Sequence, residues 1–372
     1  MSSAERDGLR PKGNVPNLRF PEFEGEWEKC KLGDVSEFSK ERVNTQNLSS
    51  DNYVATENML QDYQGFIEAS SVPTNTNVVK FNKGDVLLSN IRPYLKKVWF
   101  ADKNGGCSAD VFVFKALSAC IPDFLHYIIA NDRFINFAMS GAKGVKMPRG
   151  DKEQMKTYEI GLPSIEEQKK IATLLQLLDE RIATQNKIID KLQSLIKGLT
   201  ISFTTQQKPN TTISQCLECH SSTLQESEVS PSGLYKVYGA SGLVGYTDLP
   251  QISDDAILII KDGSGVGTTS YAQGKFSIIG TLNYLTAIGN NDLRYLYFAL
   301  SVFYFQPYKT GMAIPHIYFK DYGKAKIFCP PLTEQKRVAN ALGKLESKLF
   351  VEQELLALFN MQKQYLLGQM FI

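Results

Sequence analysis

Histidine, tryptophan and cysteine are scarce in this chain, and neither charge sign dominates it. Its 372 residues include 3 His, 2 Trp and 6 Cys, and the formal net charge is +2. No apolar run approaches the ~18 residues that a membrane-spanning helix needs, so we do not expect a membrane protein. Residues 1–15 are polar and carry both charge signs, unlike a secretory signal. We therefore expect a cytoplasmic protein whose thiols are reduced.

The bulk composition indicates an ordinary globular protein of two or three domains. Hydrophobic residues make up 43% of the chain and charged residues 22%, and 372 residues are enough for ample core. The nearly balanced charge gives no argument for nucleic-acid binding from composition alone. Any basic surface must therefore be local.

An internal repeat is the most informative feature that is present. Residues 144–199 align without a gap with residues 311–366, at an offset of 167. This length is too great for a solenoid repeat of 20–50 residues and indicates a doubled half-protein. Eleven of the 56 aligned pairs are identical, namely Gly144, Pro148, Ile160, Pro163, Glu167, Gln168, Lys169, Ala172, Leu175, Leu178 and Leu199 with their partners.

The repeat predicts a long helix in each half. Pro163 and Pro330 suit the first turn of a helix, Ser164 and Glu167 form the pattern of a capping box, and Thr333 is the expected cap of the second helix. A heptad spacing of apolar residues predicts that the two helices pair as an antiparallel coiled coil; the alternative is that each packs on its own domain. The seam residues are Ile171, Leu175, Leu178, Ile182, Ile189, Leu192, Leu199, Val338, Leu342, Leu345, Leu349, Leu356 and Leu366.

Three polar residues interrupt this seam. Gln185 and Glu352 occupy equivalent positions of the repeat, where polar residues commonly set the register. Glu352 and Lys363 both fall in the second helix, which predicts a weaker coil there or one that depends on a partner.

Mixed α/β segments precede both helices. Strand-like runs occur at 85–88, 111–114 and 256–260, and helical runs at 121–140 and 292–305. We expect an α+β protein with two globular mixed α/β domains joined by two long helices, with pseudo-two-fold symmetry. The expected parts are a flexible N-terminal arm at 1–16, a first domain at 17–161, a central spacer helix at 162–204, a second domain at 205–328 and a C-terminal spacer helix at 329–372.

Several segments resemble a known family in their order and duplication. Residues 162–168 and 329–335 each head a long helix, 84–94 lie in the first half, 238–246 lie in the second, and 18–27 open the first domain. With these segments the chain resembles the specificity (S) subunits of type I restriction–modification systems from about residue 17 to its end.

The resemblance implies a non-catalytic subunit. Its two target-recognition domains would each recognise one half of a split, asymmetric site in double-stranded DNA. The paired helices would fix the spacing and bind two methyltransferase (M) subunits, and restriction (R) subunits would join that complex in host defence. A helix of 40 residues spans ~60 Å, and two-fold DNA-binding proteins place their contacts roughly 34 Å apart or a multiple of it.

Two basic stretches and a glycine-rich loop hold the candidate DNA contacts. Residues 80–103 carry six Lys or Arg against two Asp, and 143–156 carry five against two acidic residues. Lys and Arg bind phosphates, and Arg can hold guanine with two hydrogen bonds; solvated basic loops are the alternative. With the repeat partner of the second stretch, the candidates are Asn90, Arg92, Tyr94, Lys96, Lys97, Lys143, Lys146, Arg149, Lys261, Ser264, Thr268, Tyr271, Lys309, His316 and Lys320.

No complete catalytic or cofactor motif accompanies them. The loop 261–269 is predicted to be a turn between strands and lacks the Gly-Lys-Ser/Thr ending of a nucleotide-binding P-loop. The haem-like pattern at 216–220 is attributed to chance, because covalent haem attachment needs export, for which we expect no signal. A zinc site there is not expected either, because too few further ligands exist. We therefore expect no metal or cofactor. A DNA-modifying enzyme (a nuclease or methylase with fused recognition domains) and a coiled-coil scaffold remain as alternatives.

Overall fold

The computed structural model describes residues 13–144, 146–205 and 207–372 and divides into two units. Unit 1 comprises residues up to Thr184 together with Leu356–Ile372, and unit 2 comprises Gln185–Leu355. Residues 1–12 of the predicted arm lie outside the described residues. Asn14 is bonded to Trp27, whose backbone N–H donates to the Asn14 carbonyl at 2.8 Å.

Unit 1 contains two four-stranded sheets and a two-stranded ribbon. The strand orders are β2-β9-β6-β7 and β3-β5-β8-β4, and β1 pairs with β10. The strands are β1 (Glu28–Lys31), β2 (Ser36–Phe38), β3 (Arg42–Asn44), β4 (Tyr53–Val54), β5 (Asn77–Phe81), β6 (Val86–Ser89), β7 (Val98–Phe100), β8 (Gly105–Cys107), β9 (Val111–Ala116) and β10 (Glu159–Leu162). The short helices are α2 (Leu32–Val35), η1 (Thr45–Asn47), η2 (Pro93–Leu95), α3 (Pro122–Ile129), α4 (Asp132–Ser140) and α5 (Lys152–Lys156).

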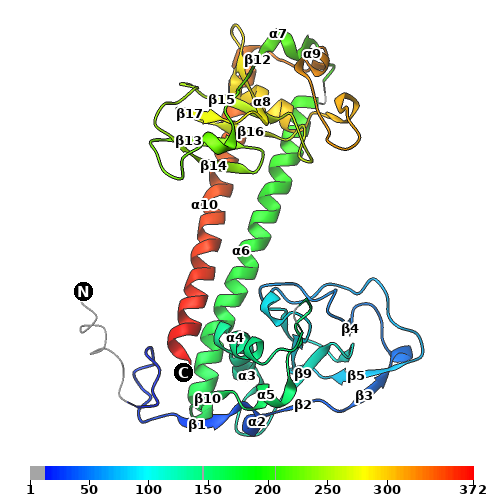
Figure 1. The fold of residues 1–372 in the computed structure, drawn as a ribbon, viewed down its shortest axis with the longest axis vertical. Helices are drawn as coiled ribbons and strands as arrows, with labels where there is room; N and C mark the ends of the chain where they lie inside the picture. Colours follow the sequence, from blue (N-terminus) through cyan, green and yellow to red (C-terminus); the bar gives the residue numbers. More distant parts are fainter. Residues whose placement is uncertain (1–12, 145, 206) are drawn as a thin grey trace. The chain divides into compact units, whose positions relative to one another are not determined.

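Unit 2 repeats this plan. Its sheets are β12-β18-β15-β16 and β14-β13-β17, and β11 pairs with β19. The strands are β11 (Thr211–Thr212), β12 (Leu217–Ser221), β13 (Tyr235–Gly239), β14 (Gly242–Thr247), β15 (Ala256–Ile260), β16 (Thr269–Ala272), β17 (Phe276–Ile278), β18 (Leu282–Ala287) and β19 (Lys326–Ile327). The short helices are α7 (Ile213–Cys216), η3 (Glu226–Glu228), α8 (Leu293–Ser301), η4 (Gln306–Tyr308) and α9 (Phe319–Tyr322), with α8 against β15 and β16 (Figure 1).

The central strands are buried on both faces, as their continuous apolar runs predict. All four residues of β6 are buried, and so are the first four of β15. The predicted helix at 121–140 is wrong in its length, because Asn131 ends α3 and caps α4 by accepting a hydrogen bond from the Arg133 N–H at 2.9 Å. The predicted helix at 292–305 likewise ends early, at Ser301.

The two long helices are confirmed as α6 (Ile165–Thr205) and α10 (Leu332–Met370). In unit 1 the Lys363 ammonium lies 2.5 Å from the Asp179 carboxylate, and the Arg181 guanidinium lies over the Phe359 ring at 4.7 Å. Rising numbers on α6 thus meet falling numbers on α10, so these segments run antiparallel. α3 lies beside this part of α6, where the Tyr127 hydroxyl donates to Asp179 at 2.8 Å (Figure 1).

In unit 2 the two equivalent polar seam residues meet each other. The Gln185 side-chain amide donates to the Glu352 carboxylate at 2.6 Å and to the Glu352 carbonyl at 3.0 Å. Glu352 and Lys363 are thus each paired with a polar group on α6. A weaker second helix, or one that depends on a partner, stays a prediction. All the predicted apolar seam residues are buried or half-buried. Some of them, including Val338 and Leu342, pack in the core of a globular part.

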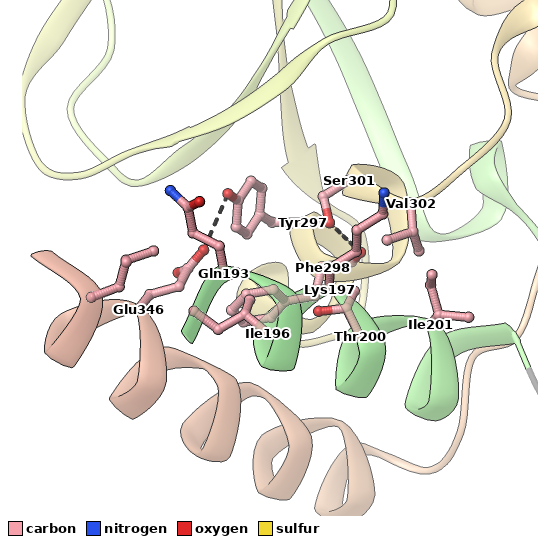
Figure 2. A pocket seen from close by; sticks show the side chains of 11 residues that line it. Gln193, Ile196, Lys197, Thr200, Ile201, Tyr297, Phe298, Ser301, Val302 and Glu346 are labelled. Carbon is pink, nitrogen blue, oxygen red and sulfur yellow. Dashed lines mark hydrogen bonds between the residues drawn. The ribbon is translucent and has the colours of Figure 1, made fainter. Parts of the chain in front are cut away.

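The repeat also places one acid per unit beneath a tyrosine of the globular part. Glu346 is the repeat partner of Asp179 and accepts a hydrogen bond from the Tyr297 hydroxyl at 3.3 Å (Figure 2). Glu346 forms an ion pair with Arg294 from α8, whereas Asp179 forms one with Lys363 from α10. Burial raises the pKa of Glu346 even beside this guanidinium. A cavity of about 370 Å³ lies here between α6, α8 and α10.

Gln168 and Gln335, an identical pair of the repeat, fix the start of each long helix to its globular part. Gln168 is fully buried; it accepts from the Ile121 N–H at 2.9 Å and donates to the carbonyls of Ala119 and Pro163. Gln335 accepts from the Asp292 N–H at 2.8 Å and donates to the Pro330 carbonyl. Both amides therefore satisfy backbone groups that the fold would otherwise bury unpaired.

We expect Gln168→Leu to lower the free energy of unfolding by roughly 2–4 kcal/mol, because it leaves one buried N–H and two carbonyls without their partner. Chemical denaturation measures the loss. Gln176→Leu is the matched control, since Gln176 is exposed on the same helix and should change stability by less than about 0.5 kcal/mol. Equal small effects of both substitutions would contradict this role for Gln168.

The predicted caps of the long helices are only partly correct. The Ser164 hydroxyl accepts from the Glu167 N–H at 3.3 Å, but the Glu167 carboxylate pairs with Arg19 through two hydrogen bonds of 2.8 Å. Thr333 is not the cap of α10, because it lies inside a helix that already begins at Leu332.

Candidate nucleic-acid interface

The two basic stretches predicted in the first half form one surface in unit 1. The loop 90–97 follows β6, and residues 146–150 lie against it. The Arg92 N–H donates to the Pro148 carbonyl at 2.8 Å, and Ile91 and Lys143 both form β-bridges with Arg149. Side chains separated by some 50 residues are thus displayed together at the end of a buried strand.

Unit 2 has the same backbone frame. The Gly263 N–H donates to the Pro315 carbonyl at 2.9 Å, and Asp262 and Thr310 both form β-bridges with His316. Equivalent backbone hydrogen bonds also join the two ends of each loop. In unit 1 the Ser89 N–H donates to the Lys97 carbonyl at 3.0 Å, and in unit 2 the Ile260 N–H donates to the Thr268 carbonyl at 3.0 Å. The loops 90–97 and 261–268 are therefore equivalent, position for position.

The side chains on these two frames differ. Asn90, Arg92, Lys97 and Arg149 stand where unit 2 has Lys261, Gly263, Thr268 and His316. A shared hydrogen-bonded frame with different side chains suits two recognition surfaces of different specificity.

Two of the cations in unit 1 adopt a costly backbone conformation. Arg92 has φ 51° and Lys96 has φ 52°, while the equivalent residues are Gly263 and Gly267, also with positive φ. The left-handed conformation costs a residue with a Cβ roughly 1–2 kcal/mol, and such strain tends to collect at functional sites. Unit 1 keeps Arg and Lys at positions where glycine would fit without strain.

Polar atoms without partners mark the same place. Among the described residues, the Asn90 Oδ1 and Arg92 Nε atoms are buried and accept or donate no hydrogen bond. Arg92, Lys97 and Asp110 line a cavity of about 460 Å³ here, together with Glu57. Buried polar groups are usually satisfied, so the Arg92 donor is available to a ligand or to water in this cavity.

The other candidates of unit 1 differ in their exposure and in their partners. Tyr94 and Lys146 are exposed. Lys96 pairs with Asp132 at 2.9 Å, Lys97 donates to the Thr56 carbonyl at 2.7 Å, Lys143 pairs with Asp151 at 2.9 Å, and Arg149 pairs with Asp110 at 3.2 Å. Glu57 and Thr56 were not predictable from the sequence, because they come from a distant segment after β4.

In unit 2 the structure gathers most candidates but not all of them. Ser264 and Thr268 are exposed on the turn between β15 and β16, which confirms the predicted strand-to-strand turn. Lys309 and Thr268 line one cavity of about 350 Å³. His316 and Lys261 belong to the paired loops, and the His316 ring lies 2.7 Å from Asp262.

Two candidates of unit 2 lie on other elements. Tyr271 is on β16, its hydroxyl donates to Asp255 at 2.9 Å, and the Arg294 guanidinium covers its ring at 4.2 Å. Lys320 is on α9, with its ammonium 5.3 Å from the Tyr318 ring. Neither has a described contact with the paired loops.

The ligand types that metals require do not gather in the part of the chain that the structure describes. No three His, Cys, Asp or Glu side chains come together there in a way that could hold an ion. The Cys216 thiol lies beside Cys329, and His220 bonds Thr286 instead. None of the helices in the described ranges is both long and apolar enough to span a bilayer.

Comparison with known proteins gives a family match over most of the chain. The family model described as "Type I restriction modification DNA specificity domain" matches residues 24–194 and 215–358. The family is one of DNA-specificity domains rather than of catalytic ones.

Curated relatives carry the same description. The type I restriction enzyme MjaVIII specificity subunit of Methanocaldococcus jannaschii is 29% identical over 188 residues, which is 49% of this chain and 42% of that protein. The EcoDI specificity subunit of Escherichia coli is 22% identical over 206 residues, 54% and 45% of the two chains. The matched region spans less than half the length of either relative.

Solved structures share the fold. The type I restriction–modification S subunit from M. genitalium superposes with a TM-score of 0.68 at 18% identity, covering 96% of this chain and 99% of that one. A second structure, from work on complex assembly and conformational transition of the type I system, has a TM-score of 0.54 at 20% identity over 92% and 96% of the chains.

Proposed function

This chain belongs to the family of type I restriction–modification DNA specificity domains, and from that premise we propose that it is the DNA-recognition subunit of a type I restriction–modification complex. The subunit recognises an asymmetric, two-part site in double-stranded DNA, one half with each unit. It performs no chemistry itself, and it acts in the cytoplasm.

One observation carries this proposal: the two units share a loop frame but differ in the side chains on it. Equivalent backbone bonds at Arg92 and Gly263 hold the loops in the same way, so the loops differ in what they can recognise rather than in how they fold. Arg can hold guanine with two hydrogen bonds, whereas a glycine at the same position cannot contact a base edge. Two such surfaces recognise two different half-sites.

Within unit 1, Glu57 adds a second recognition group to the cavity beside Arg92. Glu57 is exposed and lines the cavity with two cations, Arg92 and Lys97, and a second carboxylate, Asp110. A carboxylate repels phosphates but accepts a hydrogen bond from the cytosine amino group. Arg92 and Glu57 together therefore suit the two bases of a G·C step better than the DNA backbone.

The methyltransferase partner requires a docking surface, and α10 offers one. Within unit 1, Leu358, Met361 and Tyr365 are 59%, 67% and 62% exposed and follow one another at helical spacing. Exposed apolar stripes of this kind mark protein interfaces. We assign the binding of methyltransferase subunits to this stripe, and restriction subunits join through the complex so formed.

The isolated chain should neither cleave nor methylate DNA with magnesium or S-adenosylmethionine, and it should support methylation only with a methyltransferase subunit. Incorporation of labelled methyl groups into DNA measures both. Met361→Lys should reduce copurification of that subunit, while Lys344→Ala, an exposed change elsewhere on α10, should not. Turnover by the chain alone would favour the alternative of a DNA-modifying enzyme.

A further inference from the structure

Two thiols lie together in unit 2 although the chain has only six. The Cys216 thiol at the end of α7 donates to the Cys329 sulfur, three residues before α10, at an Sγ–Sγ distance of 3.8 Å. Cys216 is 1% exposed and Cys329 is half-buried. Cys329 is therefore the less buried residue of the pair.

The repeat shows that this pair is particular to unit 2. The Leu32 N–H donates to the Tyr158 carbonyl, and the Ile213 N–H donates to the Ala325 carbonyl in the same way. Counting from these bonds, Cys216 is equivalent to Val35 and Cys329 to Leu162. Unit 1 has two aliphatic residues at the positions where unit 2 has two thiols, so the fold itself does not require cysteine at either position.

The surroundings favour reaction at Cys329. The Gln335 side-chain amide donates to its sulfur at 3.2 Å, and the thiol hydrogen bond from Cys216 lowers the pKa of Cys329. The same bond and burial raise the pKa of Cys216. The Cys329 thiol also lies 3.4 Å from the Asn291 Oδ1 atom, which can accept its proton in a hydrogen bond. The thiolate is the nucleophilic form of cysteine, so the less buried member of the pair is assigned the first attack.

We propose that Cys216 and Cys329 are an oxidisable dithiol that a peroxide converts to an intramolecular disulfide. The Cys329 thiolate attacks the peroxide O–O bond, giving a sulfenic acid and hydroxide, which takes a proton to become water. The Cys216 sulfur then attacks the sulfenic sulfur, its proton leaves with the hydroxide as a second water, and the S–S bond forms. Two electrons pass from the two sulfurs to the peroxide. The disulfide links Cys329, three residues before α10, to Cys216 in the core of unit 2. This proposal does not depend on the DNA-binding role.

The test uses the purified full chain, equimolar hydrogen peroxide, then denaturation, alkylation with N-ethylmaleimide and intact-mass measurement. Untreated protein should take up six labels, one per cysteine, and treated protein four. Cys216→Val and Cys329→Leu place the residues of unit 1 at the two positions, and each should abolish the loss of two labels. Cys216→Val should leave a sulfenic acid at residue 329 that dimedone traps.

Cys219→Ser is the matched control, since Cys219 lies three residues from Cys216 on β12. The treated Cys219→Ser chain should still lose two labels, falling from five to three. Retention of all six labels by treated wild type, a doubled mass from a bond between chains, or loss of the effect in Cys219→Ser would each overturn the proposal.

Discussion

Replacing Arg92 by glycine is expected to weaken recognition of one half-site by roughly five- to 150-fold, the 1–3 kcal/mol of one base contact, while unit 1 stays folded. Glycine is the residue that unit 2 has at the equivalent position, and it adopts φ 51° without strain. Relief of that strain raises the free energy of unfolding by about 1 kcal/mol. The greater conformational freedom of glycine in the unfolded chain lowers it by about the same amount. Stability should therefore change little.

The measurement is the binding of the complex to DNA duplexes in which each base pair of the site is varied in turn. Arg92→Gly should lose discrimination at one or two positions in a single half-site. Arg92→Lys keeps the positive charge but cannot form the bidentate hydrogen bonds of a guanidinium. It should therefore keep the overall affinity for DNA and still lose discrimination between base pairs. A uniform loss on every sequence, with a smaller salt dependence, would make Arg92 a phosphate contact instead.

Glu57→Gln separates recognition from bulk electrostatics in the same assay. If the carboxylate only repels DNA, its loss should strengthen binding to all duplexes equally. If it accepts from a cytosine amino group, the variant should lose its preference at one position only.

Lengthening both long helices by one heptad is expected to change the gap between the two half-sites by about three base pairs. Seven residues add ~10.5 Å of helix, and one base pair occupies about 3.4 Å of DNA. The insertions belong after Gln185 and directly before Glu352, because these residues meet each other on antiparallel helices and the inserted heptads then lie on the same side of that contact. Inserted segments at those points pair with one another, and the seam on either side keeps its heptad register.

The altered gap is read from the sites that the variant complex methylates. The control is a single insertion in α6, which leaves α10 one heptad short and should destabilise the chain rather than define a new gap. An unchanged gap in the doubly lengthened protein would remove the idea that helix length sets the spacing.

The long helices were predictable because their signals are local and periodic. A heptad pattern and two proline-headed starts locate α6 and α10 to within a few residues. The partner of the Glu167 carboxylate was not predictable, because Arg19 lies 148 residues away along the chain. The break after Ile129 had a signal, Asn131 followed by Asp132 at a cap position, which the apolar run around it obscured.

The recognition loops were only partly predictable. The basic stretches indicated where cations lie, but the sequence alignment of the halves starts at Gly144 and Gly311 and does not reach the loops 90–97 and 261–268. The two loops are alike in their backbone hydrogen bonds, and such bonds do not require particular side chains, so the sequence shows no shared pattern. The matching backbone hydrogen bonds and the positive φ shared by Arg92 and Gly263 reveal the likeness. Which candidate residues contact bases stays a prediction.

Sequencing the methylated bases of a host that expresses the chain with its methyltransferase subunit tests the central claim most directly. The account predicts one new motif made of two dissimilar half-sites with a constant number of unspecified bases between them, and Arg92→Gly should relax only one of the halves. A single continuous motif, two identical half-sites, or relaxation of both halves by that one substitution would contradict the assignment of one half-site to each unit.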